Sequence, residues 1–318
     1  MRTPIINRAR GLRGRMQTTS GTERVAAYMR VARAPFLTLP VTLVVLGAAA
    51  AAVSGAFDAL ATAMAFVGLV SLHVSVNARN EYRDYHSGVD FETDPTPFSG
   101  GSKTLPEAEL EPEAARRLAL ATAGIGAIVG GYFLVTVGLV LVPILVLGAI
   151  SVLFYTSHLA RYGLGELFAG LGLGGLPVLG TALVQVGHLT SPMVVAALPA
   201  TLLTFNLLLL NEFPDQAADR QGGRANLVHR LGRPSAAVVY SAAALGVPGS
   251  IVAGWLVGPF PATALLGVVP SALLVRPVRW TVADPTGPVP VVALRDNVLW
   301  ILGTNLFLAV GLLVPAMT

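Results

Sequence analysis

The stretch SPMVVAALPATLLTFNLLLLNEFPD, residues 191–215, is an apolar run that ends abruptly in a polar pentapeptide. About 20 consecutive apolar residues are enough for an α-helix to cross the hydrocarbon core of a bilayer. The whole chain is 54% hydrophobic and 12% charged, with a mean hydropathy of +0.69. Soluble domains carry about 25% charged residues. The sequence therefore predicts an integral membrane protein.

Nine such apolar windows follow one another, which predicts an all-α, polytopic protein with nine transmembrane helices. A Gly-Pro-Phe-Pro sequence predicts a tight turn between the seventh and the eighth window. The division expected from this pattern is a basic cytosolic arm, residues 1–34, followed by a transmembrane domain, residues 35–318. The windows fall near 36–56, 58–78, 117–137, 139–159, 164–186, 191–210, 235–257, 260–278 and 297–316.

The distribution of charge predicts the orientation of the chain. Eight of the 21 Lys and Arg residues lie in the first 33 residues, and the rest fall in loops after even-numbered windows. By the positive-inside rule, the N-terminus and these loops are cytoplasmic and the C-terminus is outside. Of the 17 acidic residues only Asp58 falls in a predicted outer loop. We therefore expect the active site at the cytoplasmic face of a bacterial or archaeal cell membrane.

The N-terminal arm contains no long apolar run, so it is not expected to be a cleaved signal peptide. Residues 22–34 predict either a short basic amphipathic helix on an anionic membrane surface or a simple topology signal. The chain has no cysteine, which excludes disulfides and thiolate nucleophiles.

The pentapeptide at the end of the opening stretch occurs twice, as NEYRD at 80–84 and as NEFPD at 211–215. Both copies lie at the expected cytoplasmic end of an apolar window. Residues four apart share one face of a helix, so each copy places an asparagine and an aspartate in a ladder. The two ladders are Asn80 with Asp84, and Asn211 with Asp215 and Asp219.

Two details of the motifs concern the backbone. Pro214 removes one backbone hydrogen bond from the second ladder and is expected to kink that helix. The first motif continues through Gly88 to Asp90, which we expect in a loop beyond the helix end. Tyr155 and Tyr162 flank the loop after the fourth window, where an interfacial anchor is a more common role than a catalytic one.

Amide and carboxylate oxygens are the ligands that suit Mg²⁺, which takes one or two carboxylates and fills its shell with water and substrate phosphates. Two facing ladders therefore predict two or more Mg²⁺ ions with a pyrophosphate between them. Basic residues in two Gly-rich segments, SGGSKTL at 99–105 and DRQGGRANLVHRLG at 219–232, would contact the remaining phosphate oxygens. These candidates are Lys103, Arg220, Arg224 and Arg230.

Together these motifs resemble those of the UbiA superfamily of intramembrane prenyltransferases. The chain is most similar to the branch that prenylates 1,4-dihydroxy-2-naphthoate in menaquinone synthesis. NEYRDYHSGVD resembles the NDYxDxxxGxD pattern of that branch, and NEFPDQAADRQGGRANLVHRLG resembles its second acidic motif. Three further stretches are similar and occur in the same order: LTLPVTLVVLG at 37–47, GGSKTL at 100–105 and YGLGELFAGLGLGGLPVLGTALVQVG at 162–187.

The resemblance implies nine helices around a central cavity that opens to the cytoplasmic side. It implies Mg²⁺-dependent loss of pyrophosphate from an isoprenyl diphosphate and capture of the allylic cation by a lipophilic or aromatic acceptor, with no nucleic-acid partner. Lys103 and Arg224 would contact the phosphates. By matching position, the residues that bind diphosphate through Mg²⁺ would be Asn80, Asp84, Asp90, Asn211, Asp215 and Asp219.

The chain departs from the family pattern at several positions. Glu81 stands where the family has Asp, and Pro214 and Ala218 replace an Arg and a Thr. A Lys of the second basic segment is absent, so Arg224 would serve in its place. The aromatic pair expected just before Gln185 is also missing. These changes concern the phosphate contacts and the cavity lining rather than the metal ligands.

Two other functions remain open from the residues alone. A membrane terpene cyclase of the same superfamily would use the same diphosphate site without an acceptor. A transporter with acidic ion sites would be expected to carry ionisable residues at the membrane centre, whereas here the charges lie at one face.

Overall fold

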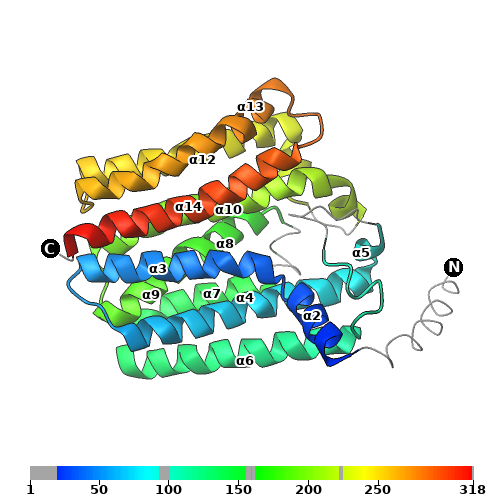
Figure 1. Cartoon of the computed structure of the whole chain (residues 1–318), viewed down its shortest axis with the longest axis horizontal. Coiled ribbons are helices and arrows are strands. Elements are labelled where there is room, and N and C mark those ends of the chain that lie inside the picture. Colours follow the sequence, from blue (N-terminus) through cyan, green and yellow to red (C-terminus); the bar gives the residue numbers. More distant parts are fainter. Residues whose placement is uncertain (1–19, 93–100, 155–158, 160–161, 222–224, 317–318) are drawn as a thin grey trace, which may run out of the picture.

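The computed structural model describes residues 20–92, 101–154, 159, 162–221 and 225–316 (Figure 1). Every regular element within these ranges is a helix, and the long helices run side by side as a bundle. The predicted all-α class is confirmed. The long elements are α3 (Thr38–Val53), α4 (Ala59–Ser87), α6 (Pro112–Val137), α7 (Val142–Phe154), α9 (Leu176–Val186), α10 (Ser191–Gln221), α12 (Arg233–Leu256), η5 (Ala262–Leu274), α13 (Val275–Ala283) and α14 (Val291–Ala316).

Shorter helices complete or connect these elements. Some of them extend a long helix, and others lie at the end of the bundle where α4 and α10 end. They are α2 (Gly21–Val31), η1 (Ala34–Leu37), α5 (Val89–Glu92), η2 (Leu139–Leu141), α8 (Gly165–Gly170), the π-helical η4 (Leu171–Gly175) and α11 (Leu227–Leu231).

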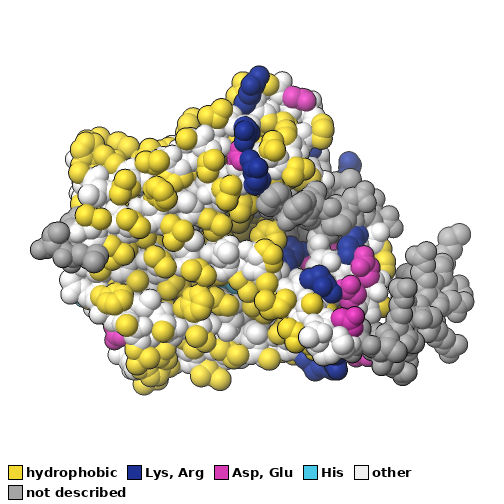
Figure 2. Space-filling model, viewed as in Figure 1, with side chains coloured by type: hydrophobic (Ala, Val, Ile, Leu, Met, Phe, Trp, Pro, Cys, Tyr) yellow, Lys and Arg dark blue, Asp and Glu magenta, His cyan; other side chains and the backbone are white. Residues whose placement is uncertain are grey.

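Eight helical stretches among the described residues are long and apolar enough to cross a membrane. The fourth predicted window corresponds to Leu139–Phe154, an apolar helix that is shorter than the others. Residues 155–158, the end of that window, lie outside the described ranges. The membrane-spanning architecture is therefore confirmed, whereas the count of nine is not. Figure 2 shows hydrophobic side chains over most of one face, with charged side chains gathered towards the end that carries α5.

The ends of α4 follow from its sequence. Asp58 caps the N-terminus, because its Oδ1 accepts hydrogen bonds from the backbone N–H groups of Leu60 (2.8 Å) and Ala61 (3.0 Å). Gly88 ends the helix in the left-handed conformation, at φ +86°. The helix thus extends beyond its predicted window and carries Asn80 and Asp84 on a continuous α-helix, as the ladder requires.

The second ladder also lies on one helix. α10 continues through both Pro199 and Pro214 as far as Gln221, so Pro214 does not interrupt it. Gln185, at the opposite end of the bundle, accepts a hydrogen bond from the backbone N–H of Asp58 (3.0 Å) and so connects the start of α4 to the end of α9.

The helix α2 packs on the bundle at the end that carries the site. Its Ala27 and Val31 are buried in a small apolar cluster with Ala78 of α4, Ala115 of α6 and Leu105 of the segment before α6. Residues 21–31 are helical, as in the first of the two alternatives, and this helix lies against the bundle (Figure 1). The division of the chain at residue 34 stays a prediction.

An unusually long 3₁₀-helix, η5, precedes α13 and includes Pro270. It packs against α14 along its length: Gly267 lies against Leu308, and Gly303 lies against Pro270. The Thr263 hydroxyl donates a hydrogen bond to the carbonyl oxygen of Gly311 at 2.6 Å. The pair η5 and α14 thus forms one closely packed layer of the bundle.

Candidate functional site at the cavity between α4 and α10

A cavity of about 270 Å³ brings the two pentapeptide motifs together. Asn80 of α4 and Asn211 of α10, the first residue of each motif, both line it. On each helix the lining residues recur at a spacing of three or four, as expected for one helix face. The other lining residues are mostly apolar and come from η1, α3, α4, α8, η4, α10 and α14. Two motifs far apart in the sequence therefore meet at one largely apolar chamber.

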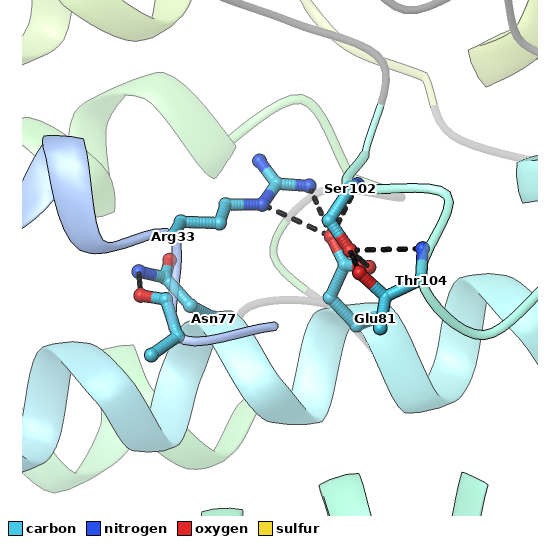
Figure 3. A network of polar contacts seen from close by, with 6 residues as sticks. Arg33, Asn77, Glu81, Ser102 and Thr104 are labelled. Carbon is cyan, nitrogen blue, oxygen red and sulfur yellow. Dashed lines mark hydrogen bonds and ion pairs between the residues drawn. The ribbon is translucent and has the colours of Figure 1, made fainter. Parts of the chain in front are cut away.

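Glu81, the second residue of the first motif, accepts four hydrogen bonds from other parts of the protein (Figure 3). Its side chain is buried, and Oε1 accepts hydrogen bonds from Arg33 Nε (3.1 Å), Arg33 Nη2 (3.0 Å) and the backbone N–H of Ser102 (3.0 Å). Oε2 accepts from the Ser102 hydroxyl at 2.6 Å. The structure therefore supports a positioning role for Glu81, because its carboxylate fixes Arg33 and the segment that begins at Gly101.

Arg33 is a residue of this site that sequence reasoning missed. It lines the cavity beside Asn80, and its backbone is held in the left-handed region at φ 52°. Asn77 supports this conformation by donating a hydrogen bond to the carbonyl oxygen of Ala32 at 2.9 Å. The sequence alone does not distinguish Arg33 from the other N-terminal arginines. A signal that could identify it is its position three residues before the start of the first apolar window.

Asp90 was expected in a loop, and this prediction is wrong: Asp90 lies in the short helix α5 that follows Gly88. Its carboxylate is buried, and its Oδ2 has no hydrogen-bond partner among the described residues. Burial, together with the neighbouring carboxylates of Glu81 and Asp84, raises the pKa of Asp90 to about 7. Lys103 donates a hydrogen bond to the backbone carbonyl of Asp90. The carboxylates of Glu81, Asp84 and Asp90 are thus close enough to repel one another, and a bound cation would stabilise their charged forms.

Gly101 lies so close to the buried side chain of Asp90 that a Cβ atom at residue 101 would require Asp90 to shift. It adopts φ +75°, and a Cβ atom there would lie 2.7 Å from Asp90 Oδ1. We expect Gly101→Ala to lower the free energy of unfolding by roughly 1–3 kcal/mol more than Gly88→Ala, because only the former adds overpacking to backbone strain. Gly88 is a matched control, since it has φ +86° and open space around its Cβ position. Equal denaturation midpoints for the two variants would contradict this close approach.

The other candidates in the two motifs are placed as follows. Asp84 is buried, and Asp215 is half-buried on α10. Asn211 Oδ1 is buried and has no hydrogen-bond partner among the described residues. The backbone of Asp219 continues α10, but its side chain lies outside what the structure describes.

The basic candidates are less closely associated with the cavity. Arg220 is exposed in the last turn of α10. Arg230 is also exposed, and its Nε donates to the carbonyl oxygen of Ala225 at 3.0 Å. Arg224 and Tyr155 lie outside the described residues. Among the described basic residues, Arg33 is the one that lines the cavity.

The segment after the second motif is tied back to the bundle. Glu166 of α8 is buried, and its Oε1 accepts a hydrogen bond from the backbone N–H of Leu227 at the start of α11. His229 forms a hydrogen bond with the carbonyl oxygen of Gln216 at 2.8 Å, which connects α11 to α10. This role of Glu166 could not be predicted from the sequence, because it depends on a contact between residues 61 positions apart. These contacts keep the second basic segment close to the end of α10.

The donor set fits a divalent cation that binds together with a phosphate. Among the described residues, no group of three or more His, Asp and Glu side chains is arranged to hold a metal ion alone. The buried oxygens without partners, Asn211 Oδ1 and Asp90 Oδ2, are nevertheless hard ligands. Mg²⁺ commonly uses one or two carboxylates and completes its shell with substrate phosphates. The site therefore suits Mg²⁺ that arrives with a phosphorylated substrate.

Comparison with known proteins identifies a family, two relatives and a solved structure that this chain resembles. Residues 39–291 match the UbiA prenyltransferase family. The chain is 27% identical over 307 residues to 1,4-dihydroxy-2-naphthoate octaprenyltransferase of Escherichia coli, covering 90% of this chain and 97% of that protein. It is also 27% identical over 218 residues to the protein of the same name from Bacillus subtilis, covering 64% and 69%. A UbiA homologue from Archaeoglobus fulgidus, solved with GPP and Mg²⁺, has the same fold, with a TM-score of 0.60, 12% identity and coverage of 90% and 98%.

Proposed function

Because the chain belongs to the UbiA prenyltransferase family, we propose that it transfers an isoprenyl group from an isoprenyl diphosphate to an electron-rich aromatic acceptor and releases pyrophosphate. The resemblance seen in the sequence is confirmed by the family match and by the two naphthoate prenyltransferase relatives. The observation that carries the proposal is the single cavity at which Asn80 and Asn211 meet. The names of the relatives make a dihydroxynaphthoate-like quinone precursor the first acceptor to test.

The polar end of the cavity would bind the diphosphate. The asparagine and aspartate oxygens of the two ladders and of Asp90 would hold Mg²⁺, which would supply positive charge to the leaving pyrophosphate. The A. fulgidus homologue was solved with GPP and Mg²⁺, which supports this assignment. The proposed ligands are Asn80, Asp84, Asp90, Asn211, Asp215 and Asp219.

Cationic side chains would bind the phosphate oxygens that face away from the metal. Arg33 is placed for this role, because Glu81 fixes one edge of its guanidinium while the residue lines the cavity. A planar guanidinium can offer two parallel N–H groups to a phosphate. Lys103 lies beside Asp90, and Arg224 is added from the sequence pattern. Arg33 would thus complement the basic residues that the sequence predicted.

The apolar walls would hold the isoprenyl chain and exclude water. Leu39, Leu207 and Ile301 are among the aliphatic residues that line the cavity, and Phe36 adds an aromatic ring near Arg33. When the C1–O bond breaks, its electron pair leaves with the diphosphate, and the allylic cation must meet the acceptor before water. A new carbon–carbon bond then forms, and the acceptor ring loses a proton.

The proposed location follows from the charges. The N-terminus and the active site would face the cytoplasm and the C-terminus the outside of the cell membrane, because the basic residues fall on one side of the spans. The charged side chains near α5 in Figure 2 lie at the end of the bundle that carries the motifs, which supports the same orientation.

The function is tested by product analysis. The purified protein in lipid nanodiscs is incubated with Mg²⁺ and geranylgeranyl diphosphate, with and without 1,4-dihydroxy-2-naphthoate or an extract of small aromatic metabolites. We expect a lipid product that contains acceptor and isoprenyl group, formed only when both substrates are present and lost when EDTA removes the metal. Cyclised hydrocarbons or alcohols formed without an acceptor would contradict a transferase and indicate a terpene cyclase.

A further inference from the structure

Two arginines on adjacent helices share one buried carboxylate at the surface of the bundle, and none of the three residues lines the cavity. Arg276 of α13 donates from Nη1 to Asp296 Oδ2 at 2.8 Å. Arg295 of α14 donates from Nε (3.2 Å) and Nη2 (3.0 Å) to Asp296 Oδ1. The side chain of Asp296 is 3% exposed, whereas those of Arg276 and Arg295 are 58% and 52% exposed. The carboxylate thus fixes two guanidinium groups at the surface.

This cluster lies on a surface that is otherwise apolar. On α13, exposed Val275 precedes Arg276, and on α14 the exposed residues Val292 and Leu299 lie on either side of Arg295. In Figure 2 the dark blue side chains near the top form a row across the helices, with yellow side chains beside them. On α14, Val298 and Leu302 line the cavity, and both are at helical spacing from Arg295, so the cluster borders the wall of the cavity. The residues of the cluster themselves, Arg276, Arg295 and Asp296, are not among the lining residues.

The depth of the cluster matches the headgroup region of a bilayer. Arg295 lies one turn after the start of α14 at Val291, which is about 6 Å along the helix. Arg276 lies two turns before the end of α13 at Ala283, which is about 10 Å. Each interfacial region of a bilayer is only about 5–8 Å thick. Arg295 lies within that thickness, and Arg276 lies slightly deeper, from where its long side chain can extend to the level of the lipid phosphates.

We propose that Arg276 and Arg295, held by Asp296, form a binding site for the phosphate headgroup of an anionic membrane lipid. The pair of arginines exceeds the single carboxylate by one positive charge, and exposed Arg279 lies one turn along α13. The arginine N–H groups that do not bind Asp296 can donate hydrogen bonds to a phosphate, and phosphate and acyl chains occur together in the headgroup region of a lipid. Such a lipid would bridge α13 and α14.

The test compares lipids that differ only in headgroup. Thermal unfolding of the purified protein in detergent is measured with added phosphatidylglycerol, phosphatidylcholine or inorganic phosphate. We expect phosphatidylglycerol to raise the melting temperature more than phosphatidylcholine, and the apparent lipid affinity to fall about tenfold in Arg276→Gln/Arg295→Gln. The matched control is Arg116→Gln/Arg117→Gln, which removes two exposed arginines from α6 and should keep the preference. A double variant at 276 and 295 that keeps the preference, or stabilisation by phosphate alone, would overturn the proposal.

A second variant separates a specific site from general electrostatic attraction. Asp296→Asn removes a negative charge, so a diffuse attraction for anionic lipid would become stronger. The site proposed here requires the carboxylate to orient both arginines, so the preference for phosphatidylglycerol should become weaker. Prenyl transfer in phosphatidylcholine shows whether this variant is folded. A stronger preference in Asp296→Asn would exclude an organised binding site.

Discussion

Asp84→Asn and Asp215→Asn are each expected to reduce the rate of prenyl transfer by a factor of about 10² to 10³, because each removes one carboxylate from a different ladder. The two residues lie on α4 and α10, whose motifs meet at the cavity. Asparagine keeps the size of the side chain but loses the charge that attracts Mg²⁺. Without the metal, the negative charge on the departing pyrophosphate is not neutralised.

The measurement is kcat/KM for isoprenyl diphosphate over a range of Mg²⁺ concentrations. A second readout is the thermal stabilisation of the protein by Mg²⁺ with pyrophosphate, which should be lost in both variants even if activity is too low to measure. Glu107→Gln is the matched control, because it removes an exposed carboxylate from the segment that follows Lys103. Full activity in both aspartate variants would refute the proposed function of the ladders.

Glu81→Ala is expected to lower the free energy of unfolding by about 2–3 kcal/mol and to raise the KM for isoprenyl diphosphate about tenfold. The substitution leaves the Arg33 guanidinium without its carboxylate, and it removes the acceptor for both donors of Ser102. Arg33 is only 28% exposed, so water replaces the lost contacts incompletely. The segment that carries Lys103 also loses its attachment to α4.

Two further variants identify what Glu81 does. Glu81→Gln keeps an oxygen for Ser102 but weakens the interaction with Arg33, so it should raise KM with a smaller loss of stability. Glu109→Gln breaks the exposed ion pair with Arg30 and should change stability by less than about 1 kcal/mol. If Glu81→Gln instead abolished stabilisation by Mg²⁺ with pyrophosphate, as expected for Asp84→Asn, then Glu81 would be a metal ligand.

The membrane spans could be predicted because a bilayer imposes a simple rule: a spanning chain must satisfy its backbone hydrogen bonds internally and expose apolar side chains. Asn80 and Asn211 could be matched because the same pentapeptide occurs at two helix ends. The rule is weaker for Leu139–Phe154, whose apolar length among the described residues is shorter than its window. The same rule could not predict that Asp90 lies in the helix α5, because the position of α5 depends on how Gly88 ends α4.

The role of Glu81 could not be predicted, because it depends on contacts between distant parts of the chain. In the sequence, Glu81 resembles one more acidic ligand beside Asn80. In the structure, Arg33 and Ser102 reach it from either side. The left-handed backbone at Arg33 depends similarly on the contact between Asn77 and Ala32. A pattern within one segment cannot show such contacts. The two ladders could therefore be predicted from the sequence, whereas the residues that support them could not.

The 3₁₀ conformation of η5 has a consequence for how the protein matches the thickness of its membrane. A 3₁₀-helix rises about 2.0 Å per residue and an α-helix about 1.5 Å. By these rises, η5 and α13 together extend about 40 Å, nearly the same as the longer sequence of α14 at about 39 Å. Stretching one helix allows a short segment to reach both surfaces of the bilayer beside a longer neighbour. Four residues inserted into η5 would give η5 and α13 together the same number of residues as α14. The pair would then be longer than α14, so its fit to the thickness of the bilayer would not improve.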